Sequence, residues 1–157
     1  MKKTIELGQG IGGELLFGMR FDAVKKILGE PEEVDNSQLE DDEGETVAWI
    51  YDKLGLTLYF DEEDEWRLGT IEVDDKEYSL NGEKLLGKPY LEVKQILENM
   101  GIGKIEEESF DLEETEGIDS RLLFSEDKCV NVWFEYDSCV NIQWSPFWKN
   151  GQQQFPA

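Results

Sequence analysis

The sequence contains no histidine, and this absence removes several kinds of chemistry at once. Without an imidazole there is no Ser-His or Cys-His catalytic pair and no histidine-ligated metal site. Basic residues are also scarce, because 15 Lys and Arg stand against 37 Asp and Glu, which gives a formal net charge of −22. Phosphate backbones and anionic lipids select for Lys and Arg, so we expect neither a nucleic-acid nor a membrane ligand.

Long apolar runs are missing as well. No segment of the 157 residues approaches the apolar core of a signal peptide or a transmembrane span. We therefore expect a cytoplasmic protein. Hydrophobic residues still make up 39% of the chain and aromatic residues 11%, which is enough for a packed core and excludes general disorder. The length favours a single domain over residues 1–157.

Only two cysteines are present, and both fall in one predicted hairpin. If residues 137–139 form a three-residue turn, Phe134 lies opposite Ile142 and the apolar residues of both strands share a face. Cys139 then lies at the turn, and Cys129 lies roughly 20 Å back along its strand at ~3.3 Å per residue. This spacing predicts two free thiols.

The sequence contains an internal repeat. Residues 12–28 recur 69 positions later as residues 81–97, and eight of the 17 aligned pairs are identical. Each copy carries one apolar stripe at helical spacing, which predicts two short helices of about three turns. The stripes consist of Phe21, Val24, Ile27 and Leu28, and of Tyr90, Val93, Ile96, Leu97 and Met100.

Alternating apolar residues predict three strands after each helix. These strands are expected at residues 46–51, 55–60 and 69–73, then at 122–125, 129–136 and 140–145, with further strands at 3–7 and 104–110. The expected fold class is α+β, with two tandem repeats at about 8–78 and 79–148. Each repeat is a short helix followed by an antiparallel β-meander, and both helices pack on one face of the sheet. Residues 149–157 are expected to be a flexible tail.

Residues 18–31, GMRFDAVKKILGEP, resemble the opening of the β-lactamase-inhibitor-protein-like repeat, where a glycine and a short helix precede a Leu-Gly-x-Pro motif. Small outer-membrane lipoproteins of the barrel-assembly machinery are similar in this stretch, although the tandem copy is closer to the inhibitor. The resemblance implies a fold whose open sheet face commonly holds a protein partner. The chain has no secretion signal, no lipidation cysteine near its start and neither cysteine pair of the inhibitor, so we expect neither β-lactamase inhibition nor outer-membrane residence.

Strand alternation predicts which side chains point away from the helices. The residues expected on or beside this uncovered face are Trp49, Tyr51, Thr57, Tyr59, Trp66, Asn131, Trp133 and Gln143, with Gln143 opposite Trp133. Aromatic and amide side chains are typical of protein-binding surfaces. The alternative is that the aromatics fill cross-strand pairs or lie beneath a loop or a partner. Phe147 and Trp148 either cap the core or extend the binding face.

Acidic residues concentrate between residues 35 and 65, where twelve acids accompany one base. The tightest run consists of Asp61, Glu62, Glu63, Asp64 and Glu65. This run is either a solvated hairpin tip that maintains solubility or a patch that steers a basic partner. A calcium-binding EF-hand loop needs glycine at its sixth position, which Trp66 occupies, and residues 41–44 lack the required spacing. No metal site is therefore predicted.

These features together predict a non-enzymatic protein-binding module without a cofactor and without catalytic residues. The expected role is an acidic cytoplasmic immunity or inhibitor protein that occludes a basic partner, such as a bacterial toxin. The protein would be a monomer or a weak dimer, with Trp49, Tyr59 and Trp133 as anchors. Two alternatives remain open, namely a self-associating structural or assembly module and a hydrolase that uses a pair of carboxylates.

Overall fold

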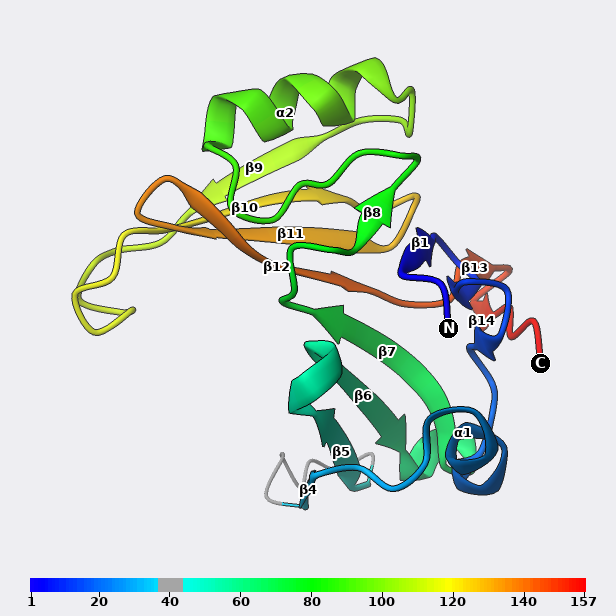
Figure 1. Cartoon of the computed structure of the whole chain (residues 1–157). Coiled ribbons are helices and arrows are strands. Elements are labelled where there is room, and N and C mark those ends of the chain that lie inside the picture. The colour runs from blue at the N-terminus through cyan, green and yellow to red at the C-terminus, as the bar shows by residue number, and fades with distance from the viewer. Residues whose placement is uncertain (37–43) are drawn as a thin grey trace.

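One antiparallel sheet of eight strands dominates the computed structural model, which describes residues 1–36 and 44–157 (Figure 1). The strand order is β4-β5-β6-β7-β12-β11-β10-β9. The bounds are β4 Glu33–Asp35, β5 Thr46–Tyr51, β6 Leu56–Asp61, β7 Arg67–Val73, β9 Glu106–Ser109, β10 Ser120–Ser125, β11 Val130–Glu135 and β12 Ser138–Trp144. Residues 41–43, considered above for calcium, lie outside the described residues.

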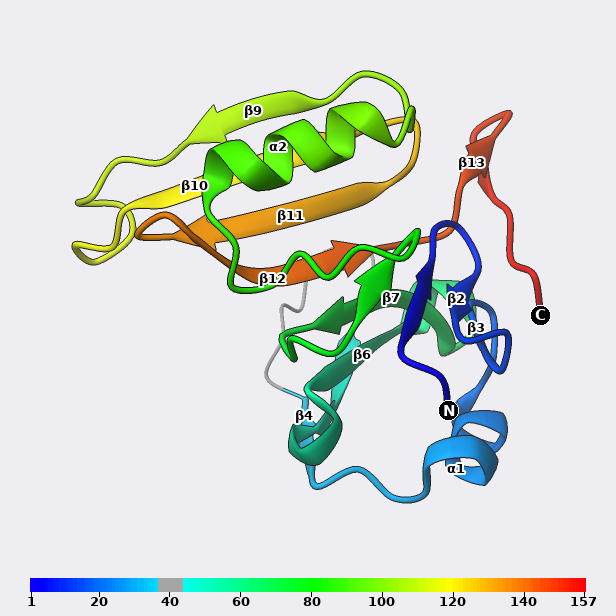
Figure 2. The same cartoon turned by 45° about the horizontal axis from the view of Figure 1, so that its top comes forward.

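Smaller elements lie beside this sheet. A four-stranded sheet has the order β3-β2-β1-β8, and β13 pairs with β14 in a hairpin. In Figure 2, helix α2 lies in front of β10 and β11, and both chain ends lie on the same side of the molecule. The bounds are β1 Thr4–Glu6, β2 Gly10–Ile11, β3 Leu15–Leu16, β8 Ser79–Leu80, β13 Trp148–Lys149, β14 Gln152–Gln153, α1 Phe21–Leu28, α2 Tyr90–Asn99, and the 3-10 turns η1 Asp52–Leu54 and η2 Glu62–Asp64.

The expected α+β class with two tandem helix-plus-meander repeats is wrong. The described chain is mostly β, with 40% strand against 16% helix and only two α-helices. The strands form one continuous sheet because β7 pairs directly with β12, which places Val73 opposite Ile142. This pairing satisfies backbone groups that two separate meanders would leave unpaired at their edges. The further strands predicted at 3–7 and 104–110 are present as the shorter β1 and β9, whereas strands of two residues, such as β2 and β8, are too short for an alternating pattern to predict.

The individual elements agree with the sequence patterns more closely than the fold class does. Both predicted helices are confirmed, and the six predicted meander strands are present with every bound within two residues of the predicted one. The core lies between the helices and the sheet, where Phe21 of α1 packs its ring 4.9 Å from that of Trp49 and 4.7 Å from that of Phe60. In the other half of the sheet, Tyr90 of α2 packs edge-on against Phe134 at 5.0 Å.

The turn between β11 and β12 differs from the predicted one. It contains two residues, Tyr136 and Asp137, whose φ angles of 47° and 62° are those of a tight hairpin. Phe134 therefore lies opposite Cys139, and the predicted pairing of Phe134 with Ile142 is wrong. The prediction that Cys129 and Cys139 are free thiols is confirmed.

The C-terminal segment, expected as a flexible tail, makes defined contacts. Residues 152–153 form β14, and Phe155 packs against the core. The backbone N–H of Ala157 donates a hydrogen bond of 3.2 Å to the carbonyl of Phe17. Within residues 1–36 and 44–157, no helix is long and apolar enough to cross a membrane.

The hairpin turn also fixes the start of α2, because the Asp137 carboxylate accepts a 3.0 Å hydrogen bond from the backbone N–H of Tyr90. The first N–H groups of a helix have no partner within the helix, so an external acceptor stabilises its end. Replacing Asp137 with Ala should lower the free energy of unfolding by about 1 kcal/mol, measured by urea denaturation. Asp137→Asn keeps an acceptor oxygen, so its loss of unfolding free energy should be less than half that of Asp137→Ala. An equal loss in both variants would contradict a stabilising hydrogen bond from Tyr90 to residue 137.

Candidate functional site

The face of the eight-stranded sheet that points away from the helices carries mostly polar, half-buried side chains. We call it the open face and define it by Thr57, Tyr59, Thr70, Glu72, Asn131, Trp133, Asn141 and Gln143. One row of directly opposed residues crosses every strand of this sheet. It consists of Glu33, Ile50, Thr57, Glu72, Gln143, Asn131, Phe124 and Glu106.

Five of the residues predicted from the sequence lie on the open face: Thr57, Tyr59, Asn131, Trp133 and Gln143. Their core-facing neighbours, such as Leu58 and Val132, are fully buried, as strand alternation requires. The predicted pairing of Gln143 with Trp133 is wrong. Gln143 lies opposite Asn131, and Trp133 lies opposite Asn141, because the two-residue turn changes the register and a bulge between Trp133 and Phe134 shifts it again by one residue.

Trp49 and Tyr51 do not lie on the open face. They oppose Leu58 and Leu56, and residues directly opposite each other share one face of a sheet. Trp49 is 6% exposed and Tyr51 is 2% exposed. The hydroxyl of Tyr51 donates a 2.9 Å hydrogen bond to the carbonyl of Gly29 at the end of α1. The prediction failed because it placed Ile50 in the core, whereas Ile50 is half-buried and opposes Thr57.

Trp66 is also on the helix side of the sheet. It occupies the turn before β7 with a φ angle of 61°, and its ring lies 6.1 Å from that of Phe21. The indole therefore extends the aromatic cluster under α1. Its assignment to the binding face was wrong because a residue in a turn is not subject to strand alternation.

Phe110, which sequence reasoning missed, covers part of the open face. It follows β9, and its ring stacks on that of Trp133 at 5.3 Å with an interplanar angle of 30°. This contact shields the indole at the β10–β11 side of the sheet. The middle of the open face, around β6, β7 and β12, is the part that Phe110 leaves uncovered.

Glu72 of β7 lies in this middle part of the open face, and sequence reasoning missed it as well. Burial raises the pKa of Glu72 above its usual range, and the nearby Asp74 carboxylate raises it further. Burial, followed by the charges of Glu72 and Asp35, raises the pKa of Tyr59. Within the described ranges, Glu72 has no ion pair and accepts no hydrogen bond. Its alternation with core-facing Ile71 and Val73 is the sequence signal that identifies it.

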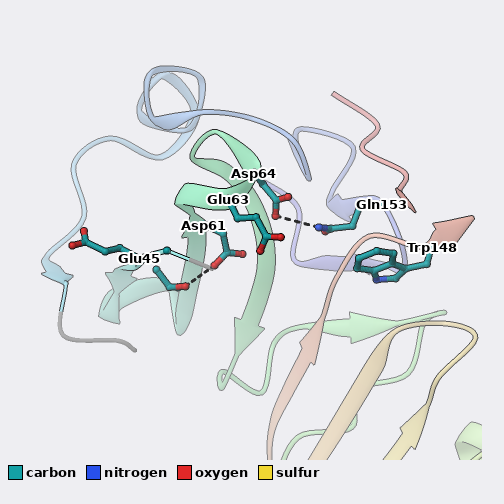
Figure 3. Close-up of a pocket in the computed structure, with 8 residues that line it drawn as sticks. Glu45, Asp61, Glu63, Asp64, Trp148 and Gln153 are labelled. Carbon is teal, nitrogen blue, oxygen red and sulfur yellow. Dashed lines mark hydrogen bonds between the residues drawn. The ribbon is translucent and has the colours of Figure 1, made fainter. Parts of the chain in front are cut away.

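A hollow of about 360 Å³ lies at one end of the open face (Figure 3). Thr46 and Asp61 oppose each other across β5 and β6, and Asp61 lies on the same side of β6 as Tyr59. The β13–β14 hairpin forms the opposite wall, where Trp148 is 59% exposed. We call this feature the acidic hollow; its lining is Gly44, Glu45, Thr46, Asp61, Glu63, Asp64, Trp148 and Gln153.

The structure divides the predicted acidic run between two environments. Asp61, Glu63 and Asp64 line the acidic hollow. Glu65 instead forms ion pairs of 3.1 Å with Arg20 and 3.6 Å with Arg67, so basic neighbours offset its charge. The five acids of the run therefore do not share one environment.

Two hydrogen bonds shape the hollow. The hydroxyl of Thr46 donates to Asp61 at 2.6 Å, and the side-chain amide of Gln153 donates to Asp64 at 3.1 Å. The second bond joins residues 89 positions apart, a contact that no local pattern predicts. Glu62 accepts a 3.2 Å hydrogen bond from the backbone N–H of Glu45 at the rim. These donors are neutral, so Asp61 and Asp64 keep their negative charge available to a ligand.

Among the described residues, no group of three or more Cys, Asp or Glu is arranged to hold a metal ion. Burial raises the pKa of Cys139 to about 12, so this thiol is protonated and unreactive at neutral pH. The arrangement of acids, amides and aromatic rings is suited to binding.

The raised pKa of Glu72 predicts a stabilising substitution. A carboxyl whose pKa is raised by folding stabilises the folded state when it is protonated, below its ordinary pKa of 4.5. This stabilisation is lost as the pH rises through the pKa of the carboxyl in the folded protein. Glu72→Gln should therefore raise the melting temperature at pH 7.5, and the gain should shrink towards pH 5. Glu33→Gln, in the same row but exposed on edge strand β4, controls for the general loss of one negative charge. Equal gains in both variants would contradict an unfavourable charge at Glu72.

Comparison with known families gives one match. The family model described as "Domain of unknown function (DUF7738)" matches residues 11–99, which is more than half of the 157-residue chain and extends from β2 to the end of α2. Comparison with curated proteins finds no match, and neither does comparison with solved structures. The chain therefore belongs to the DUF7738 family.

Proposed function

We propose that this protein is a non-enzymatic binding module that acts in the cytoplasm as an acidic immunity or inhibitor protein. Its partner would be a basic protein, such as a bacterial toxin, and it would act by steric occlusion. The observation that carries the proposal is the continuity of the open face with the acidic hollow. Carboxylates, amides and aromatic rings lie together on one side of the sheet, as in a protein-binding surface.

Charge supports a basic partner. The net charge of −22 produces a strong negative field, which raises the association rate of an oppositely charged protein. Asp61 and Asp64 concentrate this field at the hollow, where their hydrogen-bond donors are neutral. A partner that docks on the open face would therefore meet the acidic hollow at its margin.

Aromatic side chains support a specific contact. Tyr59 is half-buried in the middle of the open face, and Trp148 is 59% exposed at the wall of the hollow. Large aromatic residues that offer apolar area and one polar group are enriched among the residues that dominate binding energy. The resemblance of residues 18–31 to the β-lactamase-inhibitor-protein-like repeat adds support, because open sheet faces in that family commonly hold protein partners.

The charged edges of the large sheet oppose edge-to-edge pairing of two copies, which favours a monomer or a weak dimer over a stable self-associating module. Edge strand β4 carries Glu33 and Asp35, and edge strand β9 carries Glu106, Glu107 and Glu108. Charged residues on an edge strand oppose pairing with another edge. Two copies of this chain would bring like charges together at either edge.

The proposal is tested by affinity capture from a lysate of the source organism, at low and at moderate salt, with the captured proteins identified by mass spectrometry. We expect one basic protein that is released as the salt concentration rises. With that protein purified, Tyr59→Ala should weaken binding by about 2 kcal/mol, roughly 30-fold. The measurement is isothermal titration calorimetry.

Leu91→Ala is the matched control, because Leu91 is 76% exposed on α2, on the other side of the sheet. It should leave affinity unchanged. Equal affinities for the wild type and Tyr59→Ala would remove the open face as the binding surface. A dimer that persists at micromolar concentration in light scattering, with no protein captured, would favour the self-associating alternative.

A further inference from the structure

Glu72 occupies an unusual place for an unpaired charge. Strand β7 is one of the two middle strands of the eight-stranded sheet, and Glu72 lies between Thr57 of β6 and Gln143 of β12. Both flanking side chains are neutral. The ion pairs within the described ranges use other acids.

Among the described residues, the groups that strand pairing and electrostatic effects place around Glu72 are acidic or neutral at pH 7. Tyr59 of β6 and Asp35 of β4 lie on one side, as their mutual electrostatic effects show. Asp74 directly follows the end of β7 and is close enough for its charge to raise the pKa of Glu72. Strand β12 contributes only the amides Asn141 and Gln143 to this face. Glu72 itself therefore has no ion-pair partner among the described residues.

A second observation concerns acceptors. The side-chain oxygen of Asn141 is buried and has no hydrogen-bond donor among the described residues. Asn141 lies two residues from Gln143 on β12, so it shares the open face with Glu72. Buried polar atoms in folded proteins nearly always have a partner. This middle part of the face thus combines a carboxylate and an amide oxygen that both accept hydrogen bonds and lack donors.

Covering such a surface with a neutral partner would be unfavourable. Docking removes water from the carboxylate, and an uncompensated charge in a desolvated interface opposes binding. A cationic side chain placed on Glu72 removes this penalty. Arginine fits better than lysine, because its planar guanidinium has five N–H donors that can serve several acceptors at once.

We infer that Glu72 is the anionic anchor of the open face and binds an arginine side chain of the basic partner. The inference rests on the proposed function and deepens it, because it specifies where the partner's charge must lie. Thr57 and Gln143, which flank Glu72 on either side, offer oxygen acceptors for the remaining guanidinium N–H groups. Protonation of Glu72 would remove the anion, so the contact should weaken as the solution becomes mildly acidic.

The test uses a short synthetic peptide of alternating arginine and glycine as the probe and the full ¹⁵N-labelled chain as the target. Chemical shifts of backbone amides should change most on β6, β7 and β12 around Glu72. Glu72→Gln should weaken peptide binding about tenfold, because it removes one charge-assisted contact. Glu33→Gln should change affinity less than twofold. Lowering the pH from 7.5 to 4.5, the ordinary pKa of this carboxyl, should weaken peptide binding to the wild type more than to Glu72→Gln.

Loss of binding in Glu72→Gln is not a folding defect if that variant keeps the wild-type spectrum. Shifts that map to the acidic hollow or the sheet edges, or equal effects of Glu72→Gln and Glu33→Gln, would overturn the inference. That result would leave the proposed function intact if a captured basic protein still depends on Tyr59. Peptide binding at Glu72 with no basic protein captured would reject the immunity or inhibitor function and keep the arginine site.

Discussion

The pairing of β7 with β12 is the contact on which the rest of the molecule depends. It joins only three positions, with Ile71, Glu72 and Val73 opposite Trp144, Gln143 and Ile142. Through these positions, strands β4 to β7 and strands β9 to β12 become one sheet. Without the pairing, each half would expose an edge with free backbone N–H and carbonyl groups, which favours aggregation. Ile71, Val73, Ile142 and Trp144 also place fully buried side chains on the core side of the junction.

The same junction creates the proposed binding surface. Glu72 and Gln143 are opposed there on the open face, and their row continues through Thr57 and Asn131. The two halves of the chain thus each contribute residues to a surface that neither has alone. The core side of the junction is apolar and the open side is polar, because side chains alternate along a strand.

Stability and binding make opposite demands at this place. A half-buried carboxylate without a counter-ion disfavours folding, and burial accordingly raises its pKa. Some acids of the protein have basic neighbours, as Glu65 pairs with Arg20 and Arg67, and Glu107 pairs with Lys94 at 3.1 Å. Glu72 is half-buried without such a neighbour among the described residues, and this is the arrangement that a charge retained for a partner requires.

The sequence by itself determined the local features of this protein. Periodicity identified α1 and α2, and alternation identified the core side of β6 and β11, because both patterns depend only on nearby residues. Tertiary structure decided the rest. The register between β5 and β6 moved Trp49 and Tyr51 into the core, and a two-residue turn at Tyr136 and Asp137 reset β12. The junction of β7 with β12 and the bond from Gln153 to Asp64 join residues about 70 to 90 positions apart. Such contacts depend on how the whole chain packs, and a single sequence contains no local pattern that specifies them.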